Sequence, residues 1–135
     1  MGVEIHNHAI VENGANLDDG VSVGAYAIIE NGAIIGKDSI VESHSVIKAS
    51  ARIGNNSRIG HFSVVGGLPQ FLGFDVSTNS YASIGNEVHI GEGVTIHRSI
   101  YEKGETKVGD FCFLMGNSHI AHDCIVGKSV SLANG

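Results

Sequence analysis

The chain has 135 residues, of which 42% are hydrophobic and only 6% aromatic, and its formal net charge is −6 at pH 7. This composition suffices for the core of one domain covering residues 1–135 and excludes a disordered chain. The eight Lys and Arg residues form no cluster. We therefore expect no nucleic-acid partner, because binding to phosphates requires concentrated positive charge.

The N-terminal residues contain neither the basic region nor the apolar run of a secretory signal peptide. No stretch of the sequence approaches the roughly 18 apolar residues that a membrane-spanning helix requires. We therefore expect a cytoplasmic protein that is not inserted into a membrane.

Aliphatic residues recur at every sixth position through the first half of the chain. They are Ile5, Val11, Leu17, Val23, Ile29, Ile35, Val41, Ile47, Ile53, Ile59 and Val65. A small residue or a valine stands two positions before each of them. An α-helix would place apolar residues three and four positions apart, so this six-residue period predicts short strands joined by turns.

In such a strand the aliphatic side chain points inward and its two neighbours point outward. The residue two positions away points inward again, at a corner that only a small side chain fits. Three six-residue units then close one triangular coil, and successive coils stack as parallel strands about 4.8 Å apart. The sequence therefore predicts an all-β fold, a parallel β-helix of about six coils.

The six-residue period is interrupted twice. Between Val65 and Ile84 the spacing of aliphatic residues is 19, and this segment contains the only proline; the period is lost again after Ile96. We predict two loops that project from the helix, 67–83 and 98–106. Loops that interrupt a solenoid often mark its binding face.

A compact group of polar residues near the end of the repeat has the chemistry of an active site: His119, His122 and Asp123. Residues 18 apart stack on one face of the helix, so His122 lies against Gly104 and the second loop borders the histidine pair. Histidine can accept a hydroxyl proton near neutral pH, and an adjacent carboxylate can fix its tautomer. His122 also falls at a corner of the triangle, where a neighbouring subunit would pack.

The last aliphatic position is Leu132, which leaves the final coil open at Gly135. A solenoid end exposes unpaired strand edges and normally needs a cap. We therefore expect that this chain lacks further C-terminal coils, or that its end packs against another element.

Several segments together resemble the UDP-N-acetylglucosamine O-acyltransferases of lipid A biosynthesis, a hexapeptide-repeat acyltransferase family: Ile5–Gly14, Val94–Arg98, Thr106–Gly109 and His119–Cys124. The resemblance implies a left-handed β-helix and a homotrimer with sites between subunits. It implies transfer of a 3-hydroxyacyl group from acyl carrier protein to the 3-position of a UDP-N-acetylglucosamine-type sugar nucleotide. Members of this family continue into more coils and a helical C-terminal domain, so we expect the chain to correspond to their N-terminal half.

Matched residue by residue, the resemblance makes His122 the general base and Asp123 the carboxylate that orients it. His119, His97 and Gln70 become substrate-binding residues. We expect no metal and no cofactor.

The first loop departs from the family pattern. Family members carry an acidic residue and a lysine that hold the sugar nucleotide, and alignment on Gln70 puts Phe71 and Gly73 at these places. Either the protein accepts a different sugar nucleotide, or Asp75 replaces the missing acid. The length of the acyl chain, and the choice between a hydroxyl and an amine as acceptor, stay open.

Two alternative functions use the same repeat. A hydratase of the γ-carbonic anhydrase type binds zinc through three histidines shared between subunits, and His97, His119 and His122 are the candidates here. The other alternative is a non-catalytic β-helix fragment with a role in assembly, which the open C-terminal coil favours.

Overall fold

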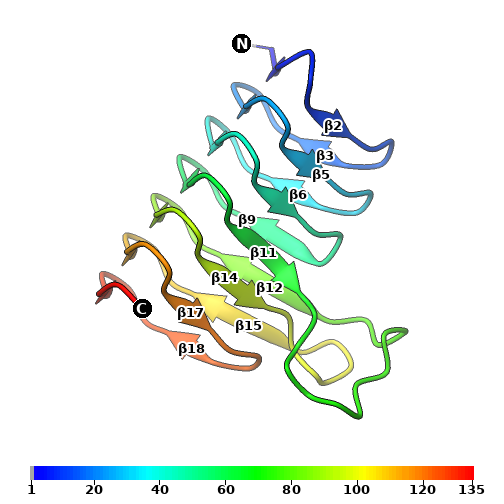
Figure 1. The fold of residues 1–135 in the computed structure, drawn as a ribbon, viewed down its shortest axis with the longest axis vertical. Helices are drawn as coiled ribbons and strands as arrows, with labels where there is room; N and C mark the ends of the chain where they lie inside the picture. Colours follow the sequence, from blue (N-terminus) through cyan, green and yellow to red (C-terminus); the bar gives the residue numbers. More distant parts are fainter. Residues whose placement is uncertain (1) are drawn as a thin grey trace.

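A computed structural model, which describes residues 2–135, shows a left-handed parallel β-helix with three faces (Figure 1). Neighbouring strands within this range run parallel in every pair. The same residues include no helix of the length and hydrophobicity needed to cross a membrane. The predicted fold class is confirmed.

Each face of the triangle is one parallel sheet. The first sheet contains β1 (Glu4–Ile5), β4 (Ser22–Val23), β7 (Ile40–Val41), β10 (Arg58–Ile59), β13 (His89–Ile90), β16 (Phe113–Leu114) and β19 (Ser131–Leu132). The second contains β2 (Ile10–Val11), β5 (Ile28–Ile29), β8 (Val46–Ile47), β11 (Val64–Gly67), β14 (Thr95–His97) and β17 (His119–Ile120). The third contains β3 (Asn16–Leu17), β6 (Ile34–Ile35), β9 (Ala51–Ile53), β12 (Tyr81–Ile84), β15 (Glu105–Val108) and β18 (Ile125–Val126).

The core is a column of aliphatic side chains inside the triangle, to which each sheet contributes. Ile29, Ile47, Ile59, Ile90 and Ile96 are all 0% exposed. Each strand places one aliphatic side chain in this column, and within uninterrupted coils these side chains lie six positions apart in the sequence. The column therefore accounts for the six-residue period of the sequence.

Small residues fill the corners, as predicted, and the buried serines among them are hydrogen-bonded. Ser45 Oγ donates to the carbonyl of Gly60 at 2.7 Å, and Ser63 Oγ donates to that of Gly91 at 2.7 Å. The hydroxyls thus satisfy carbonyls that the turn leaves without a ladder partner. At Gly60 an added Cβ would lie 2.5 Å from Gly91, so this corner also requires a residue without a side chain.

The register measures how much chain each loop inserts. Within uninterrupted coils, paired residues are 18 positions apart. Across the first loop Arg58 pairs with His89, 31 positions later, and across the second loop Thr95 pairs with His119, 24 positions later. The loops therefore add 13 and 6 residues to the regular coil, and the triangle continues unchanged beyond each.

The two loops, residues 68–80 and 98–104, are shorter than the predicted 67–83 and 98–106. The reason is that β12 and β15 pair with each other from their first residues, Tyr81 and Glu105. Both residues precede the aliphatic positions, Ile84 and Val108, at which the six-residue period returns.

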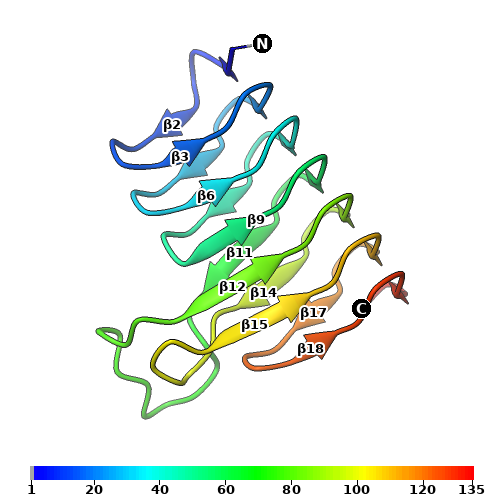
Figure 2. The same ribbon diagram turned by 180° about the vertical axis from the view of Figure 1, so that it is seen from behind.

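The loops leave the same corner and extend side by side (Figures 1 and 2). Lys103 N–H donates to the carbonyl of Asn79 at 2.6 Å, and Asn79 N–H donates to Glu102 Oε1 at 3.0 Å. The two loops are thus hydrogen-bonded to each other as well as to the helix.

Candidate active site

The corner between the second and third sheets holds the predicted site. His97 ends β14, His119 begins β17, and His122 and Asp123 form the turn between β17 and β18. The rings of His97 and His119 meet edge to face, with their centroids 4.5 Å apart. The structure therefore brings together four of the five residues predicted from the sequence, at the corner from which both loops project.

His122 and Asp123 form a hydrogen-bonded pair. His122 Nδ1 lies 2.9 Å from Asp123 Oδ2, and the two side chains are 30% and 26% exposed. The positive φ of Asp123, 65°, turns the backbone there, and aspartate tolerates this conformation better than most residues. An ionised carboxylate only accepts hydrogen bonds, so Nδ1 carries the hydrogen and Nε2 is left as the basic nitrogen.

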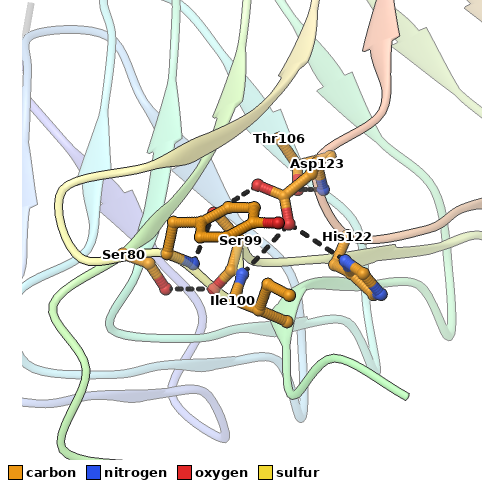
Figure 3. Close-up of polar contacts among 7 residues, drawn as sticks. Ser80, Ser99, Ile100, Thr106, His122 and Asp123 are labelled. Atoms are coloured by element: carbon orange, nitrogen blue, oxygen red, sulfur yellow. Dashed lines mark hydrogen bonds and ion pairs between the residues drawn. The ribbon is translucent and has the colours of Figure 1, made fainter. Parts of the chain in front are cut away.

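Asp123 is held by the beginning of the second loop (Figure 3). Ser99 Oγ donates to Asp123 Oδ1, and the N–H of Ile100 donates to Oδ2 at 3.1 Å. The N–H of Asp123 itself donates to Thr106 Oγ1 at 2.8 Å. Partial burial alone would raise the pKa of Asp123, but the hydrogen bonds from Ser99, His122 and Ile100 outweigh burial and hold that pKa below its ordinary value of 3.8.

His97 and His119 differ in their surroundings. His119 is exposed, and its Nδ1 lies 2.7 Å from Thr95 Oγ1. His97 packs over Gly67, where an added Cβ would lie 3.4 Å from His97 Cδ2. Burial, and then the neighbouring His119 and His122, lower the pKa of His97 below 6.5. Its Nδ1 is buried and has no hydrogen-bond partner within residues 2–135. His97 is therefore a neutral imidazole at pH 7.

Gln70, the fifth predicted residue, is exposed on the first loop. The next residue, Phe71, is the one whose ring approaches His122. The Phe71 ring lies edge-on to the imidazole of His122, with centroids 6.4 Å apart. Asp75 Oδ1 accepts hydrogen bonds within the loop, from Ser77 N at 2.9 Å and Ser77 Oγ at 2.7 Å. An aromatic ring thus stands beside the candidate base.

Arg98 ties the first loop to the helix. Its guanidinium donates to the carbonyl of Thr78 at 2.7 Å and to that of Val76 at 3.0 Å, and it lies 4.9 Å from the centre of the Phe74 ring. A cavity of about 260 Å³ beneath this loop is lined in part by Arg98, Thr78 and Lys48, and by none of the five predicted site residues.

Sequence reasoning missed Ser99, Ile100, Thr106 and Arg98. The six-residue period gave no signal for Ser99 and Ile100, because they lie in the second loop, which interrupts it. Thr106 stands two positions before Val108 in β15, where the period predicts only a small corner residue.

The geometry of a single subunit does not favour the zinc hydratase. No group of three or more His, Cys, Asp or Glu side chains within the part of the chain that the structure describes is arranged to hold a metal ion. His119 Nδ1 is engaged by Thr95, and His122 Nδ1 by Asp123.

Comparison with known proteins identifies the family. Residues 15–49 and 32–67 match the family model described as bacterial transferase hexapeptide (six repeats). The acyl-(acyl-carrier-protein)–UDP-N-acetylglucosamine O-acyltransferase of Paraburkholderia phytofirmans is 51% identical over 131 residues, which make up 96% of this chain and 50% of that relative.

Two solved structures are also similar. The UDP-N-acetylglucosamine acyltransferase of Campylobacter jejuni has a TM-score of 0.88 at 36% identity, covering 98% of this chain and 51% of its own. The enzyme of the same name from Francisella novicida has a TM-score of 0.92 at 32% identity, covering 97% of this chain and 48% of its own. The chain spans about half the length of the curated relatives that it matches over nearly its whole length. It belongs to the hexapeptide-repeat acyltransferases, in the group of the UDP-N-acetylglucosamine O-acyltransferases.

Proposed function

We propose that this protein transfers a 3-hydroxyacyl group from acyl carrier protein to the 3-position of a UDP-N-acetylglucosamine-type sugar nucleotide, the first step of lipid A biosynthesis. The observation that carries the proposal is the pair of His122 and Asp123, whose arrangement leaves Nε2 basic at the corner where both loops project. The relatives named above support the choice of substrates, since their names state both acyl carrier protein and the sugar nucleotide.

In the proposed reaction, Nε2 of His122 removes the proton of the acceptor hydroxyl or amine while that group attacks the thioester carbonyl carbon. The bond from this carbon to sulfur then breaks, and the imidazolium returns the proton to the leaving thiolate. Asp123 keeps Nδ1 protonated and stabilises the positive charge on the ring during the step. No metal or cofactor is required for this balance of bonds and protons.

The test is His122→Ala in the full-length protein. We expect the rate of acyl transfer to fall by about 10² to 10⁴-fold, because general-base catalysis contributes that much, while sugar-nucleotide binding persists. His89→Ala is the matched control, since His89 is an exposed histidine on the first sheet. Turnover near the wild-type rate in His122→Ala would show that His122 is not the base.

The proposed assembly is a homotrimer with the site between subunits. The outer face of the second sheet carries one continuous apolar column that leads into Thr95 and His119: Ile10, Ile28, Val46 and Val64. An exposed ladder of rings runs beside it along the corner between the first and second sheets: His8, Tyr26, His44 and Phe62. An apolar strip of this extent favours coverage by protein. A second copy seated there would close over His119.

A further inference from the structure

We propose that Ser99 is a positioning residue for the reaction, so that the working unit at this corner is a chain of three side chains, Ser99, Asp123 and His122. The inference rests on the proposed role of His122 as the base. It adds a residue that fixes how the carboxylate faces the imidazole.

The two oxygens of Asp123 have separate partners. Oδ1 accepts the hydrogen of Ser99 Oγ, whereas Oδ2 faces His122 Nδ1 at 2.9 Å and also accepts from the N–H of Ile100 at 3.1 Å. Rotation of the carboxylate would break the bonds at both oxygens. Ser99 thereby fixes the rotation of the carboxylate and the direction from which it meets His122 Nδ1 (Figure 3).

The hydroxyl of Ser99 has no alternative direction for its hydrogen. Its side chain is 0% exposed, so water does not compete for it. Its oxygen already accepts from the N–H of Tyr101 at 2.9 Å, and its single hydrogen is directed to Asp123. A hydroxyl that donates to a carboxylate makes a stronger hydrogen bond than one that donates to a neutral group.

Both loops fix the position of Ser99. Ser80 Oγ, at the end of the first loop, donates to the carbonyl of Ser99 at 2.5 Å, and the N–H of Ser99 donates to the carbonyl of Tyr81 at 3.3 Å. In the second loop, a Cβ added at Gly104 would lie only 2.3 Å from Ser99 Oγ. A side chain at position 104 would therefore clash with the hydroxyl of Ser99.

A purely local role for Ser99 is the competing explanation, because serine often caps the N–H two residues later, as Ser99 does for Tyr101. The two explanations differ at Asp123. A cap contributes to stability alone, whereas a positioning residue also controls the protonation and orientation of the carboxylate.

The experiment compares Ser99→Ala with Ser45→Ala, which removes an equally buried serine hydroxyl at a different corner, between the first and second sheets, where it donates to the carbonyl of Gly60. Carboxyl ¹³C NMR titration gives the pKa of Asp123, and imidazole ¹⁵N shifts give the tautomer of His122 at neutral pH. In Ser99→Ala we expect the pKa of Asp123 to rise by about one pH unit. We also expect the Nδ1–H tautomer of His122 to become a mixture, with both quantities unchanged in Ser45→Ala.

Gly104→Ala is a second variant, which keeps the hydroxyl but pushes it away from Asp123, and we expect it to shift both quantities in the same direction. Unchanged pKa and tautomer in Ser99→Ala and Gly104→Ala would overturn the proposal and leave Ser99 as a local cap. These readouts need no substrate. A wild-type protein that transfers no acyl group would therefore contradict the proposed function without altering the result for Ser99.

Discussion

Phe71 makes one side of the site apolar where the resemblance leads us to expect charge. Its ring stands edge-on to His122, and Gly73 packs near that ring, since an added Cβ there would lie 3.6 Å from Phe71 Cε2. Asp75 forms hydrogen bonds within the loop, since its Oδ1 accepts from both the N–H and the hydroxyl of Ser77. Of the two explanations that the sequence leaves open, we propose a different preference among sugar nucleotides.

The variant Phe71→Asp tests this interpretation. A restored carboxylate should raise the affinity for UDP-N-acetylglucosamine about ten-fold or more, since a hydrogen bond to a charged group contributes about 1.5 to 3 kcal/mol. Calorimetry on the full-length protein, with this nucleotide and its 3-amino analogue, measures the change. Leu72→Asp adds the same charge to the fully exposed neighbour and serves as the control. Equal affinities in the two variants would mean that Phe71 does not stand at the anchor position.

The first loop is held in place by hydrogen bonds to the helix and to the second loop. Arg98 binds two of its carbonyls, and Asn79 binds the second loop through both its main chain and its side chain. The C-terminal part of the loop, residues 76–79, is thus held close to the helix and to the second loop.

Removal of the anchor, in Arg98→Ala, should loosen residues 68–80. We expect amide hydrogen exchange in this range to accelerate about ten-fold or more, because two hydrogen bonds of about 1 kcal/mol each are lost. Exchange in β8 should stay unchanged. Arg52→Ala is the control, since Arg52 lies 3.5 Å from the centre of the Tyr81 ring but binds no carbonyl of the first loop. An unchanged exchange rate in the loop would contradict an anchoring role.

The strands and core could be predicted because the six-residue period encodes the inward side chain of each strand directly. Ile29, Ile47 and Ile59 were identified in this way, and all are fully buried. The loop ends could not, since the start of β12 depends on its pairing with β15 rather than on the period. The contact of Ser99 with Asp123 was equally inaccessible, because it spans 24 residues across an insertion that follows no repeat.

The three faces of the helix differ in the chemistry of their outward side chains. The outer column of the second sheet is aliphatic from Ile10 to Val64, whereas the third sheet places Arg52 and Lys107 among its outward side chains. The apolar face is also the one that ends at His119. Assembly through the second sheet would therefore complete the active site and cover the apolar column in one step.

Val46→Asp places a charge in the middle of this column and should dissociate the proposed trimer, because the charge would be buried without a partner. Size-exclusion chromatography with light scattering should give the mass of a monomer, with the β-sheet circular dichroism retained. Ile34→Asp, at an outward position of the third sheet that is 43% exposed, should remain a trimer. A trimeric Val46→Asp would place the interface on another face.

The coils keep their register across insertions of 13 and 6 residues, so loops of this β-helix can vary in length and sequence without changing the coils. Each coil contacts only its neighbours, so a change of loop sequence affects the energy of adjacent coils and leaves distant ones unaltered. Substitutions at Phe71 and Gly73, in the first loop, would accordingly change the surroundings of His122 while the packing of distant coils stays the same.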